Sequence, residues 1–256
     1  MTNIEVKILN PEVLAEAEKM MVCAARLTQR GEKIKNLDDF MGLYEASYTQ
    51  KTVKDMAVLP HNTIRQFNMV NVVVVGASRR FLAQITRRRV GVTFTSASLQ
   101  YSDYSDDANF VVPYEIMEKG QKAISAYLAS CQMMMSQYKS ATSTFGIDKD
   151  AAGYMAPQGL ANILMISATP QAWIEMIRQR VCRRNTKETQ YVLLLIWEQL
   201  AHFNPRMYAA NVAGPPCSVD GTCPEGKMAC GRPIERAMAH PRDLIALDFP
   251  LLRPGL

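Results

Sequence analysis

The chain has 256 residues, of which 48% are hydrophobic and 21% charged, and its formal net charge is +5. This composition supplies a large apolar core and excludes an intrinsically disordered protein, while the length suits one generous domain or two small ones. No apolar run is long enough to span a membrane, and the first residues lack the basic and apolar regions of a secretory signal. We therefore expect a soluble, cytoplasmic protein with no membrane partner.

Hydrophobic periodicity and turn residues predict ten elements along the chain. They are, in chain order, a strand over residues 4–9, helices over 11–29 and 38–56, a strand over 68–75, a helix over 79–89, an extended segment over 92–101, a helix over 114–139, a short strand over 163–166, and helices over 170–180 and 187–202. Gly76 is expected to end the second strand. Ser78 and Thr169 are expected to cap the helices that follow them.

This mixture of many helices and few strands, without regular alternation, predicts an α+β fold with helices packed on a small central sheet. We expect residues 1–256 to form a single domain. From about residue 205 the chain is rich in turn residues, so this Gly/Pro/Cys-rich segment is expected to be peripheral. Residues 250–256 are expected to form a loose tail.

Three cysteines lie close together in that segment, namely Cys217, Cys223 and Cys230. They could bind zinc with a fourth ligand such as His240. However, the spacing lacks a paired Cys-x-x-Cys knuckle, and structural disulfides are rare in the cytosol. We therefore expect a reduced or partly oxidised loop and no metal site.

Arginines occur in two clusters, the first made of Arg79, Arg80, Arg87, Arg88 and Arg89, and the second of Arg178, Arg180, Arg183 and Arg184. Any single one of them is best explained as part of a solvated helix face. Two clusters flanked by apolar sequence instead indicate an anionic partner such as a nucleotide, a folate or nucleic acid. Aromatic residues make up only 8% of the chain and do not interleave with the clusters, which argues against RNA.

Common catalytic signatures are absent. The sequence has no Walker loop, no Gly-x-Gly-x-x-Gly turn, no Gly-x-Ser-x-Gly elbow and no His-Glu-x-x-His helix. Only three histidines are present, so a histidine-centred triad has few candidates. The chemistry must therefore rest on other residues.

A series of motifs follows in order along the chain: His61-Asn62-Thr63, then Gln84-Ile85-Thr86-Arg87-Arg88-Arg89, then Ser98-Leu99-Gln100-Tyr101, and later Gln179-Arg180-Val181-Cys182-Arg183-Arg184. In order and near-spacing these pieces resemble the motifs of the flavin-dependent thymidylate synthases, the ThyX family. The resemblance extends over most of the chain up to about Leu200.

The resemblance implies a ThyX-like fold and the C5 methylation of a uridine monophosphate nucleotide, most simply dUMP to dTMP. It implies FAD as the redox cofactor, methylenetetrahydrofolate as the one-carbon donor and NADPH as the reductant. It also implies a homotetramer with active sites shared between subunits, a small-molecule nucleotide as substrate, and no nucleic acid partner.

Site residues follow from the same resemblance. It implies that Arg180 is catalytic, because its positive charge would stabilise the negative charge that develops on the pyrimidine. It implies that the nucleotide is bound by Gln84, Arg87, Ser98, Leu99, Gln100, Tyr101 and Arg180. It implies that FAD is bound by Thr63, Arg87, Arg88, Arg89 and Ser96. Backbone N–H groups near Ser78 and along residues 96–102 are expected to be available to a phosphate.

This chain departs from the family pattern at several positions. Arg88 replaces a histidine, Gln100 replaces an arginine, Ser96 replaces an acidic residue, and Gly153 or Tyr154 replaces a second arginine. Two cations that would hold the substrate phosphate are therefore missing or relocated. These changes leave three alternatives open, namely a methylase that also accepts UMP, a family member that binds nucleotide without catalysis, and an arginine-rich RNA-binding protein.

Overall fold

A computed structural model describes residues 1, 3–46, 48–106, 108–232, 235 and 239–252. Its core element is a four-stranded antiparallel sheet in the order β1-β2-β4-β3. The strands are β1 (Glu5–Ile8), β2 (Val70–Ser78), β3 (Val92–Ser96) and β4 (Ala161–Ala168). The longest pairing joins β2 to β4, with Val70 opposite Ala168 and Ser78 opposite Ala161.

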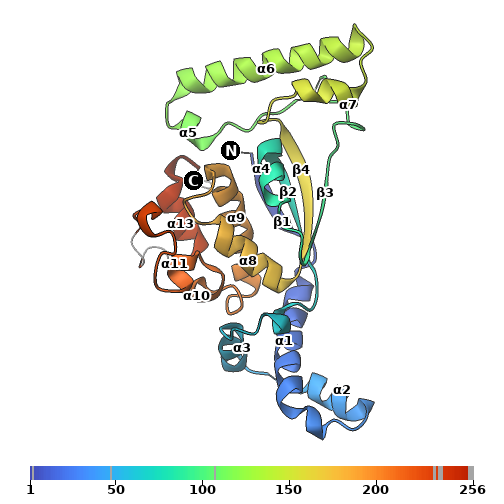
Figure 1. Ribbon diagram of the computed structural model, residues 1–256, viewed down its shortest axis with the longest axis vertical. Helices are drawn as coiled ribbons and strands as arrows, with labels where there is room; N and C mark the ends of the chain where they lie inside the picture. The colour runs from blue at the N-terminus through green and yellow to red at the C-terminus, as the bar shows by residue number, and fades with distance from the viewer. Residues whose placement is uncertain (2, 47, 107, 233–234, 236–238, 253–256) are drawn as a thin grey trace.

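Helices occupy both ends and one face of this sheet (Figure 1). The N-terminal helices at one end are α1 (Glu12–Arg30), α2 (Leu37–Glu45) and α3 (Gln50–Ala57), and those at the other end are α5 (Tyr114–Met117), α6 (Gln121–Ser143) and α7 (Lys149–Ala152). The remaining helices are α4 (Arg79–Ile85), α8 (Pro170–Arg180), α9 (Lys187–Phe203), α10 (Ala210–Ala213), α11 (Pro216–Val219) and α13 (Pro241–Asp248). Short 3₁₀ turns are η1 (Gly31–Lys33), η2 (Asn62–Arg65), η3 (Gly153–Met155), η4 (Gly226–Met228) and η5 (Pro250–Leu252). The predicted α+β fold with helices on a small sheet is confirmed.

The two faces of the sheet differ sharply in exposure, because successive side chains of a strand point to opposite sides. Val72, Val74, Leu164 and Ile166 are all buried on the helix-covered face. On the other face Val75, Ile163 and Met165 are 39%, 51% and 48% exposed. One apolar face of the sheet is therefore uncovered within a single chain.

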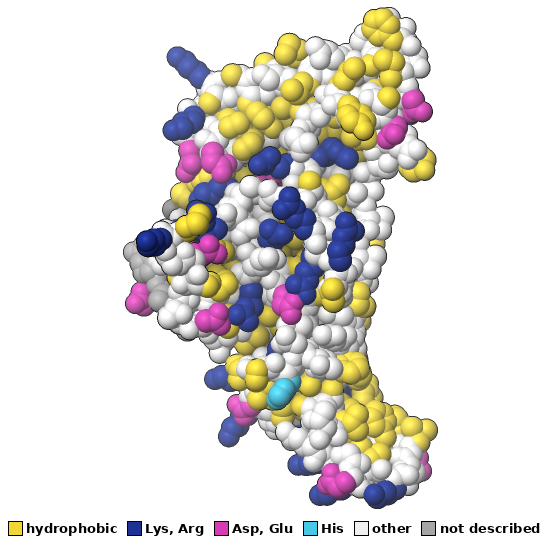
Figure 2. Space-filling view, viewed as in Figure 1, with side chains coloured by type: hydrophobic (Ala, Val, Ile, Leu, Met, Phe, Trp, Pro, Cys, Tyr) yellow, Lys and Arg dark blue, Asp and Glu magenta, His cyan; other side chains and the backbone are white. Residues whose placement is uncertain are grey.

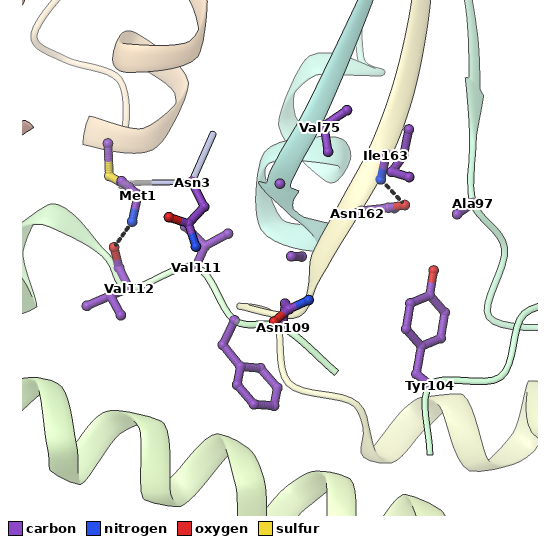
Figure 3. A pocket seen from close by; sticks show the side chains of 13 residues that line it. Met1, Asn3, Val75, Ala97, Tyr104, Asn109, Val111, Val112, Asn162 and Ile163 are labelled. Carbon is purple, nitrogen blue, oxygen red and sulfur yellow. Dashed lines mark hydrogen bonds between the residues drawn. The ribbon is translucent and has the colours of Figure 1, made fainter. Parts of the chain in front are cut away.

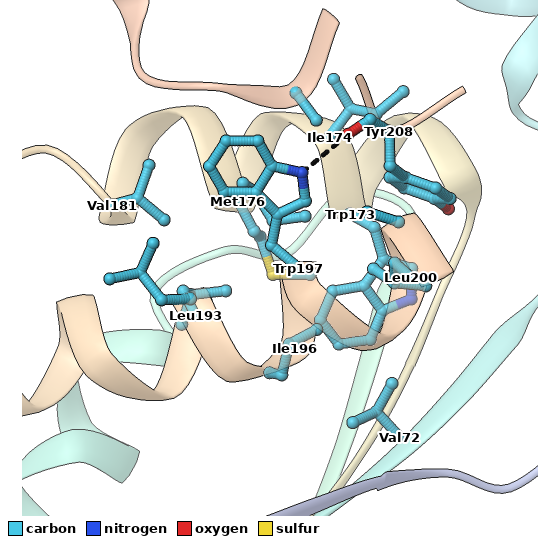
Figure 4. Packing of buried hydrophobic residues seen from close by; sticks show 14 of the residues in the cluster. Val72, Trp173, Ile174, Met176, Val181, Leu193, Ile196, Trp197, Leu200 and Tyr208 are labelled. Atoms are coloured by element: carbon cyan, nitrogen blue, oxygen red, sulfur yellow. Dashed lines mark hydrogen bonds between the residues drawn. The ribbon is translucent and has the colours of Figure 1, made fainter. Parts of the chain in front are cut away.

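Two tryptophans hold α8 and α9 against the covered face (Figure 4). Trp173 and Trp197 are fully buried, and each indole N–H has an acceptor. The Trp173 Nε1 donates to the Val70 carbonyl at 3.0 Å, and the Trp197 Nε1 donates to the Tyr208 carbonyl at 2.7 Å. A buried tryptophan needs such a partner for its N–H. Each of the two side chains therefore adds both buried apolar area and a directional hydrogen bond to the core.

Several predicted boundaries are wrong, and capping residues explain two of them. The helix expected over residues 38–56 is two helices, because the Thr49 side chain accepts from the Thr52 N–H and starts a new one. The helix expected over 114–139 breaks at Gly120, whose φ of 81° has the left-handed sign. The helix expected over 79–89 ends at Ile85, which leaves the three arginines that follow it outside the helix.

Gly76 does not end its strand. Strand β2 continues to Ser78 through a bulge, where the register with β4 shifts between Val75 and Ala77. Gly76 has a φ of 78°, and a Cβ at this position would lie 2.4 Å from the Asn3 carbonyl oxygen. Glycine is thus required here both by backbone conformation and by space.

The segment from about residue 205 is not peripheral throughout. Met207, Tyr208, Leu244 and Phe249 are buried in the same core as the sheet and α9. Their part of the chain therefore completes the core, while residues 224–231 are exposed. The loose tail expected from residue 250 is wrong for residues 250–252, which form η5 with Leu252 buried; residues 253–256 lie outside the described part of the chain.

The described residues contain no helix that is long and apolar enough to cross a membrane.

We expect Gly76→Ala to lower the free energy of unfolding by about 3–5 kcal/mol, because it adds a steric clash to backbone strain. Gly146→Ala is the matched control: Gly146 also has a positive φ, 63°, but no atom lies within 4 Å of its added Cβ. The control should lose only about 1 kcal/mol. Urea denaturation measures both, and equal losses would contradict the role assigned to the Asn3 contact.

Glu188 joins the start of α9 to the end of β2. Its carboxylate accepts from the Ser78 N–H at 2.7 Å and from the Ser78 hydroxyl at 2.5 Å. Burial raises the pKa of Glu188 above its usual range, although Ser78, the N-terminal ammonium and Arg80 oppose the shift. Ionisation of this carboxyl is therefore less favourable in the folded than in the unfolded state.

A raised folded-state pKa means that the contribution of Glu188 is fully present at low pH and is lost as pH rises through that pKa. We expect Glu188→Gln, which cannot ionise, to show a smaller fall in unfolding free energy from about pH 4 to pH 7 than the wild type. Urea denaturation at a series of pH values tests this. If the unfolding free energy of the variant depended on pH as steeply as that of the wild type, the pKa of Glu188 would not be raised by folding.

Candidate active site

Two polar cavities lie at opposite ends of α4. The first, the arginine cavity, has a volume of about 860 Å³ and is lined by, among others, Arg87, Arg88, Arg89, Gly91, Glu175 and Arg180. The second, the serine cavity, has a volume of about 490 Å³ and is lined by, among others, Arg79, Ser96, Ser98, Leu99, Gln100 and Gly153. Both volumes fall in the range of small-molecule sites.

The arginine cavity forms where the chain turns from α4 into β3. Arg87, Arg88 and Arg89 follow the end of α4, and the Gly91 carbonyl accepts from the Thr169 N–H at 3.0 Å. This bond places the three arginines beside the start of α8, whose last residue, Arg180, lines the same cavity. Lys and Arg side chains gather on the middle of the molecular face drawn in Figure 2.

Arg88 is neutralised within the cavity. Its guanidinium forms an ion pair with Glu175 of α8. The other Glu175 oxygen accepts from the Gln171 side-chain amide at 2.7 Å. Arg88 is therefore held in place by α8, and its charge is balanced.

Arg87 and Arg89, in contrast, have no acidic partner among the described residues. Arg180 donates to the Gln84 carbonyl and to the Asn185 side chain, both at 3.1 Å. Burial lowers the pKa of Arg180, and the charge of Arg87 lowers it further. The cavity thus carries excess positive charge, which favours an anionic ligand.

A buried arginine, Arg65, fixes the turn η2 at the edge of this cavity. It is 5% exposed and donates to the Ala57 carbonyl at 2.8 Å and the Leu59 carbonyl at 3.1 Å. It also donates to the Gln171 side-chain oxygen at 2.7 Å. Since Gln171 binds Glu175, a chain of polar contacts runs from η2 to the ion pair of Arg88.

Thr63 lies within η2 but does not line the arginine cavity, whereas its neighbours Asn62 and Gln66 do. The Asn62 side-chain oxygen accepts from Arg65 at 3.0 Å. The resemblance placed Thr63 at the flavin, and this assignment stays a prediction.

The side chain of Gln84 is hydrogen-bonded to the N-terminal end of α9. Its side-chain oxygen accepts from the hydroxyls of Thr186 at 3.1 Å and Thr189 at 2.8 Å. Only its amino group is left for a ligand. The predicted contact of Gln84 with a nucleotide therefore depends on that group.

The serine cavity is built around a tight turn after β3. The Ser98 hydroxyl accepts from the Gln100 N–H at 3.1 Å, and the Ser98 carbonyl accepts from the Ser102 N–H at 3.0 Å. The N–H groups of Ser98 and Leu99 have no acceptor in the described part of the chain. The turn therefore keeps two backbone donors for a ligand.

Gly153 closes the other side of this cavity against Leu99. A Cβ on Gly153 would lie 3.3 Å from the Leu99 Cβ, so the two positions are packed tightly. Of the predicted nucleotide contacts, Ser98, Leu99 and Gln100 line this cavity, but Tyr101 does not and is 81% exposed.

Ser96, assigned to the flavin by the resemblance, lines the serine cavity rather than the arginine cavity. The backbone donors expected near Ser78 are already used: the N–H groups of Arg79 and Arg80 donate to the carbonyls of Leu160 and Gln158. The Ser78 N–H donates to Glu188. The expectation that this helix start supplies donors to a phosphate is therefore wrong.

The second arginine cluster is divided in function. Arg178 pairs with Asp220 at 3.2 Å, and Arg183 pairs with the buried Asp248. These two arginines hold the C-terminal part of the chain, so only Arg180 of the cluster lines the arginine cavity.

A third cavity of about 430 Å³ lies beside the N-terminus and differs in chemistry (Figure 3). Its described lining includes Asn162, Asn109 and Tyr104 but no Lys or Arg side chain. It is therefore a poorer match for an anion than the other two. The described residues also contain no group of three or more His, Cys, Asp or Glu arranged to hold a metal ion.

Sequence reasoning missed Arg65, Gln171 and Glu175. Their contacts join positions up to 106 residues apart, and none belongs to a recognisable motif. No sequence signal marked them, because α8 carries several polar and charged residues besides Gln171, and the burial of Gln171 is visible only in the structure.

Residues 12–206 match the family model described as thymidylate synthase complementing protein, Thy1. Because the match covers more than half of the chain, the protein belongs to this family, and the resemblance to the ThyX family is confirmed.

The individual relatives are distant. The chain is 23% identical over 175 residues to a flavin-dependent thymidylate synthase of Clostridium tetani, covering 62% of this chain and 68% of that protein. It is 22% identical over 223 residues to a flavin-dependent thymidylate synthase of Geobacter sulfurreducens, covering 86% of this chain and 91% of the relative.

Two solved structures share the fold at 14% identity. The UMP/dUMP methylase PolB of Streptomyces cacaoi, bound with 5-Br dUMP, gives a TM-score of 0.63 over 81% of this chain and 94% of PolB. ThyX of Helicobacter pylori, with FAD and dUMP, gives a TM-score of 0.58 over 80% of this chain and 97% of that one.

We expect Arg65→Met to lower the free energy of unfolding by about 2–4 kcal/mol, because it leaves two backbone carbonyls and Gln171 without their donor. Arg178→Met is the matched control. It breaks a partly exposed ion pair and should lose less than about 1 kcal/mol. Urea denaturation compares the two variants, and a loss from Arg65→Met no larger than that of the control would contradict the role given to Arg65.

Proposed function

We propose that the protein catalyses the flavin-dependent C5 methylation of a uridine monophosphate nucleotide, converting dUMP to dTMP and also accepting UMP. The observation that carries this proposal is the pairing of the two cavities. Four arginines from α8 and from the segment after α4 share one cavity, and the turn at Ser98 forms the second at the other end of α4.

The arginine cavity fits FAD. Its charge is positive, because Arg87 and Arg89 have no acidic partner among the described residues, and a pyrophosphate carries the complementary charge. Arg87, Arg88 and Arg89 would hold the cofactor, with Thr63 near its edge. When bound and reduced by NADPH, the flavin would supply the reducing equivalents for converting a transferred one-carbon unit into a methyl group.

The serine cavity would hold the nucleotide. Ser98, Leu99 and Gln100 form one wall, and the N–H groups of Ser98 and Leu99 are available as donors. Ser96 lines the same cavity and Tyr101 would lie at its margin, while the amino group of Gln84, near the other end of α4, would meet the base beside Arg180. A nucleotide extending from this cavity toward Arg180 would bring its base to the positive charge of that side chain.

Arg180 would act as an electrostatic catalyst. Its guanidinium is fixed by the carbonyl of Gln84 and by Asn185, so its orientation is set before substrate binds. A preorganised cation beside the pyrimidine stabilises negative charge as it develops on the ring during attack by C5. No covalent enzyme nucleophile is needed for this role.

The co-substrates and assembly follow from the family. We propose methylenetetrahydrofolate as the one-carbon donor and NADPH as the reductant. We also propose a homotetramer, supported by the apolar face of the sheet around Ile163 and Met165, which a single chain leaves uncovered.

An alternative is a family member that binds nucleotide without catalysis. The ion pair of Arg88 with Glu175 favours it, because this pair stands where the family pattern has a histidine and leaves Arg88 without free charge. Bound flavin without turnover would identify that alternative.

We expect the purified protein to bind FAD and to show a flavin absorption spectrum that shifts when dUMP is added. Arg180→Gln should keep the flavin and lower methylation of dUMP by about 100-fold or more, because it removes the cation beside the base. Arg178→Gln, on the same helix but outside the arginine cavity, is the control and should retain activity. Comparing dUMP with UMP then fixes the sugar preference.

Several results would count against the proposal. A protein that binds no flavin under any condition contradicts the mechanism and favours simple nucleotide or RNA binding. If Arg180→Gln were as active as Arg178→Gln, Arg180 would have no role in the reaction. Strict specificity for dUMP would limit the protein to thymidylate synthesis.

A further inference from the structure

The side chain of Arg79 has no acidic partner among the residues that the structure describes. It begins α4, and its backbone N–H donates to the Leu160 carbonyl at 3.0 Å, which fixes its position. Its Nη1 atom is buried, yet it has no hydrogen-bond partner in the described part of the chain. A buried charged donor left unpaired is costly, so this geometry points to a bound anion.

This side chain lines the serine cavity. Among the described residues that line that cavity, Arg79 is the one lysine or arginine. Ser98 and Gln158 lie in the same lining, as does an exposed carboxylate, Asp150, at the rim. Any anion held there must therefore depend on Arg79 and must overcome some repulsion from Asp150.

The cavity also lacks the two arginines that the family pattern would supply. Gln100 stands at one of these positions, and Gly153 or Tyr154 at the other. Tyr154 is 93% exposed, and the space at Gly153 is taken by Leu99 at 3.3 Å. Neither position places a cation in the cavity.

We propose that Arg79 binds the 5′-phosphate of the nucleotide and so replaces the two lost arginines. The proposal rests on the proposed function and adds the residue that recognises the phosphate. An arginine can grip a phosphate through two parallel N–H···O bonds, and the Ser98 hydroxyl with the N–H groups of Ser98 and Leu99 would complete the anion site.

The test measures nucleotide binding by calorimetry on the FAD-loaded protein. Arg79→Gln should weaken dUMP binding by about 10- to 100-fold, because it removes a charge-assisted contact. Binding of deoxyuridine, which lacks the phosphate, should not change. Arg79→Lys keeps the charge but loses the paired geometry, so its affinity for dUMP should fall between those of the wild type and the Gln variant.

Arg80→Gln is the matched control, since Arg80 is the next residue, is exposed and lies outside the serine cavity. It should bind dUMP as the wild type does. If Arg79→Gln bound dUMP with wild-type affinity and still methylated it, the role of Arg79 would be overturned and the proposed function would stand. An equal loss of deoxyuridine binding would show a structural role instead. A wild-type protein that binds no dUMP would overturn the proposed function together with this inference.

Discussion

The pairing of β2 with β4 is the constraint on which the site depends. The strands run antiparallel, so β2 ends at Ser78 where β4 begins, and α4 starts from that end while α8 starts from the other. Helix α4 then returns the chain toward α8, which brings the arginines after α4 beside it. The register is set by which side chains face the core, and a slip of one residue would expose Val72 and Val74. The packing of the sheet therefore places the two cavities, and local contacts such as the hydrogen bond from Thr169 to Gly91 then fix the arginine cavity.

The arginines fall into two groups, those paired with acids and those without an acidic partner among the described residues. Arg178 and Arg183 pair with acids and hold the C-terminal part of the chain, and Arg88 is balanced by Glu175. Arg79 and Arg87 have no such partner among the described residues. A modest net charge of +5 can thus coexist with a positive arginine cavity, because Glu175 balances Arg88 while Arg87 and Arg89 have no acidic partner among the described residues.

Much of this could be predicted from local sequence. β-branched runs indicated β2, and Thr169 with Pro170 indicated the start of α8, because these signals act over a few residues. The bulge at Gly76 could not be predicted, since the reason for glycine is the Asn3 carbonyl, brought close only by the fold. The buried core residues Met207 and Phe249 were missed for a similar reason. Isolated apolar residues in a turn-rich sequence show no hydrophobic periodicity. The motif residues were found in order, but their division between two cavities required coordinates.

The contact between Leu99 and Gly153 has a consequence for how this lineage can change. A Cβ added at position 153 would lie 3.3 Å from the Leu99 Cβ, so a side chain there requires Leu99 to shift by a few tenths of an ångström. Substitutions at positions 99 and 153 are therefore expected to be coupled, and a smaller residue at position 99 should make a side chain at position 153 easier to accommodate.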